Sequence, residues 1–140
     1  MQDFKIELFE KEYKINFPSY LHLSEQDSFS IRSKISGKYN LSIHSLNKEL
    51  SSIELPLEDI NVEENFDISR IFEIIELSPL SKIYINWYKF DDIDLFDLVD
   101  FNKYFYDIWF PCSDDIDIFD ESLNWIISIR HDGFVSYIKI

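Results

Sequence analysis

The sequence predicts an α+β fold, in which an antiparallel β-sheet has one or two helices packed against it, and a single domain spanning residues 1–140. Three observations support this prediction. Several segments alternate apolar and polar residues, as half-buried strands do. One segment repeats its apolar residues at helical spacing. The chain also contains no alanine, the best helix former, so strands rich in isoleucine and aromatic residues should dominate.

Two hairpins are expected in the N-terminal part of the chain. Residues 4–17 alternate as two short strands around a turn at residues 10–12, and Pro18 ends the second strand. Residues 28–46 alternate in the same way around a three-residue loop at 36–38, which places the apolar residues of both strands on one face.

The clearest helix is predicted at residues 66–77, where four apolar residues between Ile68 and Ile75 follow the i, i+3, i+4, i+7 pattern. Residues 82–90 then read as a strand rich in β-formers. Residues 92–106 are predicted to be helical, mainly because the segment is too long for one strand. Their apolar residues spread round the helical wheel, so the choice between helix and strand stays open for this segment.

A hairpin is predicted at the C-terminal end. Residues 116–119 form a short strand, and residues 123–130 alternate cleanly before Asp132-Gly133, a two-residue type I′ turn signal. Residues 134–140 return along the hairpin. With that turn, Trp125, Ile127 and Ile129 oppose Ile140, Ile138 and Ser136.

The charge of the chain is unevenly distributed. Residues 1–50 hold seven acids and seven bases, so the whole net charge of −14 comes from residues 51–140. This half of the chain should repel nucleic acids and anionic membranes. It should attract a basic protein and speed its association at low salt.

The sequence offers little for catalysis, and we expect no enzymatic activity and no cofactor. It has none of the common nucleophile or metalloprotease motifs, and its two glycines are too few for a phosphate-binding loop. The runs 91–94 and 114–117 hold carboxylates that could bind Ca²⁺ or Mg²⁺, but neither has EF-hand spacing, so no metal is expected. A lone cysteine, no leader and no long apolar run predict a cytoplasmic protein.

Residues 91–121 combine eleven carboxylates with eight aromatic residues and a single lysine, Lys103. A disordered acidic tail would lack the aromatics. One interpretation is a solvated surface over an aromatic core, because Asp is common in turns and at strand ends. The other is a surface for a basic partner, since aromatic side chains surrounded by polar groups are typical of binding interfaces.

A resemblance to a known family supports the second interpretation. The run Phe105-Tyr106-Asp107-Ile108-Trp109-Phe110-Pro111-Cys112-Ser113-Asp114-Asp115-Ile116-Asp117-Ile118-Phe119-Asp120, followed by residues 125–133, resembles the immunity proteins of bacterial contact-dependent growth inhibition and other polymorphic toxin systems. The resemblance covers about a third of the chain. It implies a cytoplasmic, non-enzymatic inhibitor that forms a heterodimer with a cognate toxin domain. Many such toxins are nucleases, acting on RNA, tRNA or DNA through basic clefts.

The resemblance suggests a toxin-binding surface made of acids and aromatics. The expected carboxylates are Asp91, Asp94, Asp97, Asp100, Asp107, Asp114, Asp115, Asp117, Asp120 and Glu121. The expected aromatic anchors are Tyr88, Tyr104, Tyr106 and Trp109. Two alternatives remain: an acidic nucleic-acid mimic of the anti-restriction type and, with less support, a carboxylate-dependent metal-binding protein.

Overall fold

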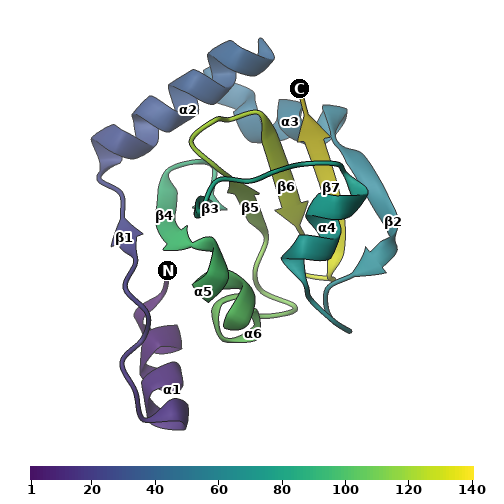
Figure 1. The fold of residues 1–140 in the computed structure, drawn as a ribbon. Helices are drawn as coiled ribbons and strands as arrows, with labels where there is room; N and C mark the ends of the chain where they lie inside the picture. The colour runs from purple at the N-terminus through teal and green to yellow at the C-terminus, as the bar shows by residue number, and fades with distance from the viewer.

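The computed structural model describes all 140 residues and contains one seven-stranded sheet (Figure 1). Neighbouring strands are antiparallel and follow the order β1-β4-β3-β5-β6-β7-β2. The elements are α1 (Asp3–Tyr13), β1 (Leu21–His22), α2 (Glu25–Tyr39), the 3₁₀-helix η1 (Ile43–Ser45), α3 (Leu46–Ile53), β2 (Leu55–Asn61), α4 (Ile68–Ile74), β3 (Lys82–Tyr88), β4 (Asp92–Asp97), α5 (Leu98–Lys103), α6 (Phe105–Ile108), β5 (Ile116–Phe119), β6 (Trp125–Ile129) and β7 (Phe134–Lys139). The predicted antiparallel α+β fold is confirmed, with six α-helices rather than one or two.

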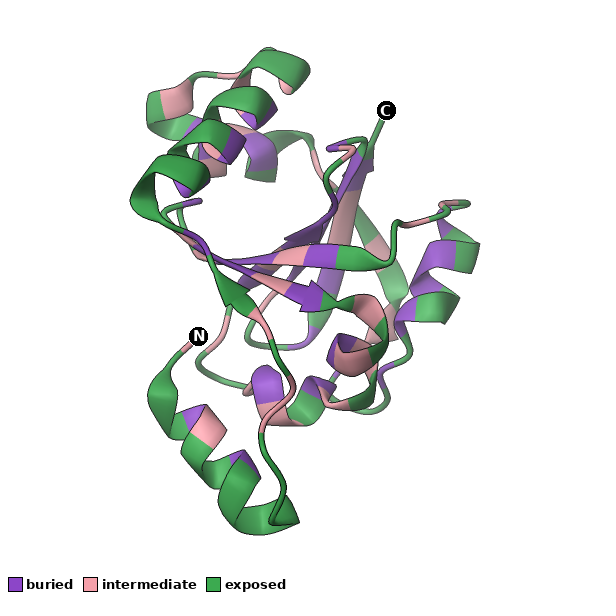
Figure 2. Cartoon of the chain, turned by 60° about the vertical axis from the view of Figure 1, so that its left-hand side comes forward, coloured by how far each residue is buried: buried purple, intermediate pink, exposed green.

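Helices lie on both sides of the sheet, so the protein has two cores (Figure 2). The larger core lies between one face of the sheet and α4, α5 and α6, and includes Phe105 and Ile127. The smaller core lies between the opposite face and α2 and α3, and includes Leu50 and Ile126. Because successive strand residues point to opposite faces and both faces are covered, all five residues of the interior strand β6 are buried. None of the helices is both long and apolar enough to cross a membrane.

The hairpins predicted for residues 4–17 and 28–46 are wrong, because these segments form mainly α1 and α2. In α1 the two buried residues are Lys5 and Phe9, four positions apart and therefore on one face of the helix. The period-two alternation in this segment reflects apolar residues that remain exposed, such as Leu8 at 51%. Burial of one narrow stripe is sufficient to hold α1 against α6.

Capping residues delimit α2. The Ser24 side chain accepts a hydrogen bond from the Asp27 amide at 3.1 Å, and Asn40 ends the helix in the left-handed conformation. The buried residues Ser28, Ile31 and Ile35 recur at helical spacing. A serine followed by acidic residues was therefore the sequence signal for this helix.

The helix predicted over residues 92–106 is wrong for its first half, which forms β4. The turn from β3 into β4 consists of Lys89 and Phe90, with φ values of 48° and 58°. A turn with two positive φ values usually contains glycine or asparagine, so this one gave no recognisable signal. Here the Asn86 side-chain oxygen supports the turn by accepting hydrogen bonds from the Tyr88 and Phe90 amides.

The predicted helix at 66–77 and the predicted strands of the C-terminal half are confirmed as α4, β3, β5, β6 and β7. The register of the last hairpin differs from the prediction by one residue: Trp125, Ile127 and Ile129 pair with Lys139, Tyr137 and Val135. The loop has three residues instead of two, because the Arg130 amide donates to the Phe134 carbonyl at 3.0 Å and Gly133 adopts a φ of +86°.

Candidate functional site

A row of polar residues crosses the sheet on the face that α2 and α3 cover. Asn86, Asp117, Ser128 and Ser136 are directly paired neighbours on β3, β5, β6 and β7. Asn86 and Ser128 are buried, and both donate hydrogen bonds to the Asp117 carboxylate, at 2.8 and 2.6 Å. The apolar surface of the sheet is therefore interrupted beneath α3 by a hydrogen-bonded polar row.

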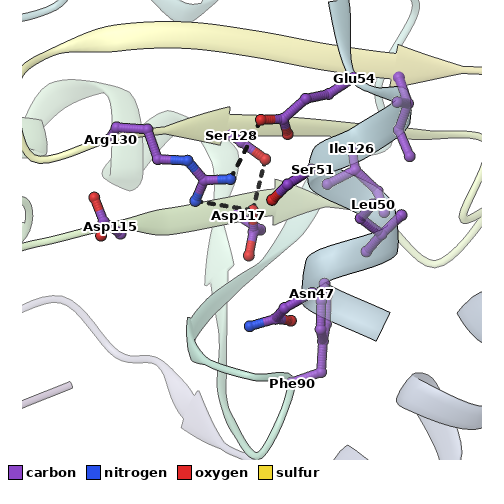
Figure 3. A pocket seen from close by; sticks show the side chains of 11 residues that line it. Asn47, Leu50, Ser51, Glu54, Phe90, Asp115, Asp117, Ile126, Ser128 and Arg130 are labelled. Atoms are coloured by element: carbon purple, nitrogen blue, oxygen red, sulfur yellow. Dashed lines mark hydrogen bonds and ion pairs between the residues drawn. The ribbon is translucent and has the colours of Figure 1, made fainter. Parts of the chain in front are cut away.

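Asp117 and Ser128 of this row line a cavity of about 140 Å³ between α3 and the sheet (Figure 3). A recess of about 350 Å³ adjoins it and shares four lining residues with it: Asn47, Asp115, Asp117 and Arg130. We call the cavity and recess together the polar groove. A cavity of 140 Å³ is large enough for a group of about benzene's size.

Arg130 lies across the polar groove between two carboxylates (Figure 3). Its guanidinium nitrogens are 3.5 Å from a Glu54 oxygen and 3.8 Å from an Asp117 oxygen. Both distances exceed the usual length of a hydrogen bond, so Arg130 is held by charge more than by directed bonds. The groove also contains the Asn47 side-chain oxygen, which is buried and has no hydrogen-bond partner.

The polar groove carries more negative than positive charge. Its lining contains three carboxylates, those of Glu54, Asp115 and Asp117. It contains two basic side chains, Arg130 in the cavity and Lys89 in the recess. With its unpaired acceptor on Asn47, the groove suits a cationic group that donates several hydrogen bonds, such as a lysine ammonium or an arginine guanidinium.

Beyond the polar groove the sheet is not covered by a helix. Tyr88 and Phe134 are exposed here, at 61% and 56%. We call this region the open sheet face, and define it by Tyr88, Asp115, Arg130 and Phe134 at the ends of β3, β5, β6 and β7. It presents two aromatic side chains beside the charged lining of the groove.

The edge strand β2 adds acids to the border of the open sheet face. Leu57 and Ile60 both pack against the larger core. Glu58 and Asp59 lie between them and are exposed, so they point away from that core. The pairing of β2 with β7 is irregular between Pro56 and Asn61, which allows two successive residues to face outward.

Asp115 also forms an ion pair at the hairpin loop. Its carboxylate oxygen accepts from the His131 amide at 2.7 Å and lies 2.9 Å from the His131 ring nitrogen Nδ1. Hydrogen bonding to Asp115 raises the pKa of His131. Burial alone would raise the pKa of Asp115, but its hydrogen bonds from the ring and amide of His131 outweigh burial and hold it below the ordinary value.

These shifts predict a pH dependence for the hairpin loop. The raised pKa of His131 means that the pair stabilises the fold fully below the ordinary histidine pKa of 6.5, and that this contribution is lost as pH rises through the folded value. At acid pH the contribution disappears as Asp115, whose pKa is lowered from 3.8, takes up its proton. An NMR titration of His131 should give a pKa above 6.5, and Asp115→Asn should lower it. An unchanged pKa in that variant would contradict the pairing.

Most carboxylates of the predicted toxin-binding surface have partners within the chain. Asp91 pairs with Arg32 at 3.0 Å and Asp97 with Lys82 at 3.2 Å. Asp107 accepts a hydrogen bond from the Tyr13 hydroxyl at 3.0 Å. The two predicted carboxylates for which no side-chain partner is found are Asp100 and Glu121. Much of the charge in residues 91–121 is therefore neutralised internally.

Three residues predicted to contact a partner are buried instead, and we correct their assignment. Asp94 and Asp120 are 0% and 1% exposed and accept hydrogen bonds from the indoles of Trp87 and Trp125. Trp109 is 0% exposed and donates to the Asp114 carbonyl at 2.9 Å. Indole and carboxylate groups are buried when the fold can satisfy their hydrogen bonds. Asp114 is also structural, because it pairs with the buried Lys5 at 2.6 Å.

The remaining predicted anchors do not share one surface. Tyr88 lies at the open sheet face. Tyr104 is half-buried and packs edge-on against Phe9, with ring centroids 4.9 Å apart. Tyr106 is 48% exposed and donates a hydrogen bond from its hydroxyl to the Val62 carbonyl at 2.5 Å. The structure therefore brings together Tyr88, Asp115 and Asp117 from the predicted set.

Sequence reasoning missed a second acidic segment. Residues 54–76, from the end of α3 to the turn after α4, hold eight acids and one base. Seven of these acids are exposed and form no ion pair: Glu58, Asp59, Glu63, Glu64, Asp67, Glu73 and Glu76. The charge imbalance of this segment is visible in the sequence, but the segment has few of the aromatic residues that distinguish residues 91–121.

Comparison of the chain with protein-family models, with curated proteins and with solved structures finds no match. The fold and the polar groove define an acidic α+β protein with a partly uncovered sheet.

Proposed function

We propose that this protein is an immunity protein, which binds and neutralises a basic toxin domain of the nuclease type by placing the open sheet face against the toxin's phosphate-binding cleft. One observation carries the proposal: Tyr88, Asp115 and Asp117 converge at a groove with excess negative charge on an uncovered face of the sheet. An exposed aromatic beside acids is the arrangement expected for an interface anchor.

The chemistry of the polar groove supports a basic partner. An arginine or lysine of the toxin that entered the groove would meet the carboxylates of Glu54 and Asp117 and the unpaired oxygen of Asn47. Nuclease clefts present such side chains because they bind phosphate. The same side chains, once occupied by carboxylates, can no longer hold the nucleic acid.

The exposed acids of β2 and α4 would act at longer range. Unpaired surface charges contribute little to the final affinity, but they raise the association rate at low ionic strength. Glu58 and Asp59 lie on the strand that borders the open sheet face. An interface of about 1,600 Å² would include this border and the groove together.

The test uses the C-terminal domain of the protein encoded immediately upstream, the place where a polymorphic toxin system encodes its toxin. Co-expression with the chain should restore growth, and the purified proteins should form a one-to-one complex. In the complex, Tyr88→Ala should weaken binding by about 2 kcal/mol, or roughly 30-fold, as expected for a central aromatic anchor. Glu58→Lys with Asp59→Lys should lower the association rate mainly at low salt.

A matched control reverses the same amount of charge elsewhere. Asp100→Lys with Glu121→Lys changes two carboxylates that have no ion-pair partner and lie outside the open sheet face. This control should slow association less than the β2 pair does. Equal losses for both pairs would contradict the placement, and failure to bind the upstream domain would contradict the function. Binding to several unrelated DNA-binding proteins would favour the nucleic-acid mimic.

A further inference from the structure

A second cluster of ligating side chains lies at the opposite edge of the sheet. His22 on β1 and Asp94 on β4 are directly paired cross-strand neighbours. The His22 nitrogen Nδ1 is 2.7 Å from the Asp94 oxygen Oδ1 and 3.9 Å from the Asp92 oxygen Oδ1. One ligand atom from each residue lies within 4.8 Å of the other two. Asp92 precedes Asp94 by two residues, so the strand places both on the same face.

The Asp94 carboxylate is held in one orientation by its other oxygen. Asp94 is 0% exposed, and its Oδ2 accepts a hydrogen bond from the Trp87 indole at 2.9 Å and contacts the amino group of Met1. Oδ1 is thereby directed at His22. A carboxylate that binds a metal through one oxygen is typically oriented in this way by hydrogen bonds to the other.

Asp92 has a buried carboxylate oxygen without a hydrogen-bond partner, and this oxygen lies in the same cluster. Its Oδ1 atom is buried and has no hydrogen-bond partner, although the carboxylate as a whole is 46% exposed. This oxygen is the one that faces His22. A buried acceptor without a partner is uncommon in native proteins and is usually explained by a bound water or ion. An ordinary ion pair between His22 and Asp94 leaves this oxygen unexplained.

We propose that His22, Asp92 and Asp94 form a binding site for a divalent transition-metal ion of the Zn²⁺ type. One imidazole and two carboxylates are ligands that Zn²⁺ accepts, and three protein ligands leave the fourth tetrahedral position for water. An imidazole ligand favours Zn²⁺ over Mg²⁺ and Ca²⁺, which prefer oxygen alone.

The ion would fasten β1 to the sheet. β1 is a two-residue edge strand, and its only strand neighbour is β4. It joins α1, which packs against α6, to α2, which lies on the opposite side of the sheet from α6. A metal that bridges β1 and β4 therefore stabilises the connection between the two helical layers. This role is independent of the proposed toxin-binding surface.

The test is calorimetric titration of the full chain with ZnCl₂, with MgCl₂ and CaCl₂ as comparisons. We expect one Zn²⁺ per chain and a melting temperature that rises with Zn²⁺ concentration, because a ligand that binds the folded state stabilises it. The indole N–H signal of Trp87 should shift in NMR spectra, while those of Trp109 and Trp125 stay in place. Trp87→Phe assigns that signal.

Two variants and two controls decide the outcome. Asp92→Asn removes a ligand oxygen that makes no hydrogen bond in the chain, so it should keep the metal-free stability and lose at least about tenfold in Zn²⁺ affinity. His22→Ala should lose at least as much. His44→Ala and Asp100→Asn, an exposed histidine and an unpaired acid elsewhere, should bind Zn²⁺ like the unmodified protein. No Zn²⁺ binding, or equal binding by Asp92→Asn, would overturn the proposal.

Discussion

Replacing Asp120 with alanine should lower the free energy of unfolding by about 3–5 kcal/mol, because it leaves four hydrogen-bond donors, including the buried Trp125 indole, without an acceptor. The Asp120 carboxylate is 1% exposed. It accepts hydrogen bonds from the Leu80 amide at 3.0 Å, the Ser122 amide at 2.9 Å and the Trp125 indole at 3.1 Å, and from the Ser122 hydroxyl. It thus joins the β5–β6 turn to the segment that leads into β3.

Such a loss is a large part of the 5–15 kcal/mol that stabilises a typical domain. Urea denaturation followed by circular dichroism would measure it. Asp120→Asn keeps the shape and one acceptor oxygen, so its loss should be smaller than that of alanine. As a surface control, Glu121→Ala should change stability by less than about 0.5 kcal/mol. A loss below about 1 kcal/mol for Asp120→Ala would contradict the role given to this network.

Asp114→Ala should have a similar effect through a different mechanism, by leaving Lys5 as an unpaired buried cation. Lys5 is 1% exposed, and its ammonium donates to the Asp114 carboxylate at 2.6 Å and to the Ile108 carbonyl at 2.8 Å. It also lies over the Trp87 ring, 4.3 Å from the centroid. Burial lowers the pKa of Lys5, and Asp114 opposes that shift. Removing one partner of a buried pair typically costs about 3–5 kcal/mol.

A double-mutant cycle separates the ion pair from the packing around it. Lys5→Met removes the charge while keeping an apolar side chain of similar length. In that background Asp114→Ala no longer strands a cation, so the double variant should be more stable than the Asp114→Ala single variant. Urea denaturation of the four proteins gives the coupling energy. If the losses of unfolding free energy in the two single variants simply add in the double variant, Lys5 and Asp114 do not stabilise each other, and the proposed ion pair is contradicted.

The C-terminal half was predicted more accurately than the N-terminal half, and the reason is physical. The strands β3, β5, β6 and β7 are rich in isoleucine and aromatic residues, and the loop between β6 and β7 contains Gly133 at a positive φ. Their local preferences agree with their place in the sheet. The register error of one residue arose because both faces of β6 are buried, so apolar alternation could not distinguish one register from the next.

The N-terminal helices were missed because their apolar residues are divided between the core and the surface. Only Lys5 and Phe9 of α1 are buried, and a buried lysine cannot be recognised from a hydrophobic pattern. The site was predicted only in part for a related reason. Asp115 and Asp117 were found by their charge, but Asn47 lies in α3 and Glu54 directly after it, and this helix was not predicted.

The position of β2 has a consequence for the order in which the chain folds. β2 occupies an edge of the sheet, and β7 is its only strand neighbour. Residues 55–61 leave the ribosome well before residues 134–139, so during synthesis β2 has no strand to pair with. Pairing between distant segments is slow, and unpaired strands are prone to aggregate. Pro56, Glu58 and Asp59 discourage pairing with another chain, and so protect this segment until β7 emerges.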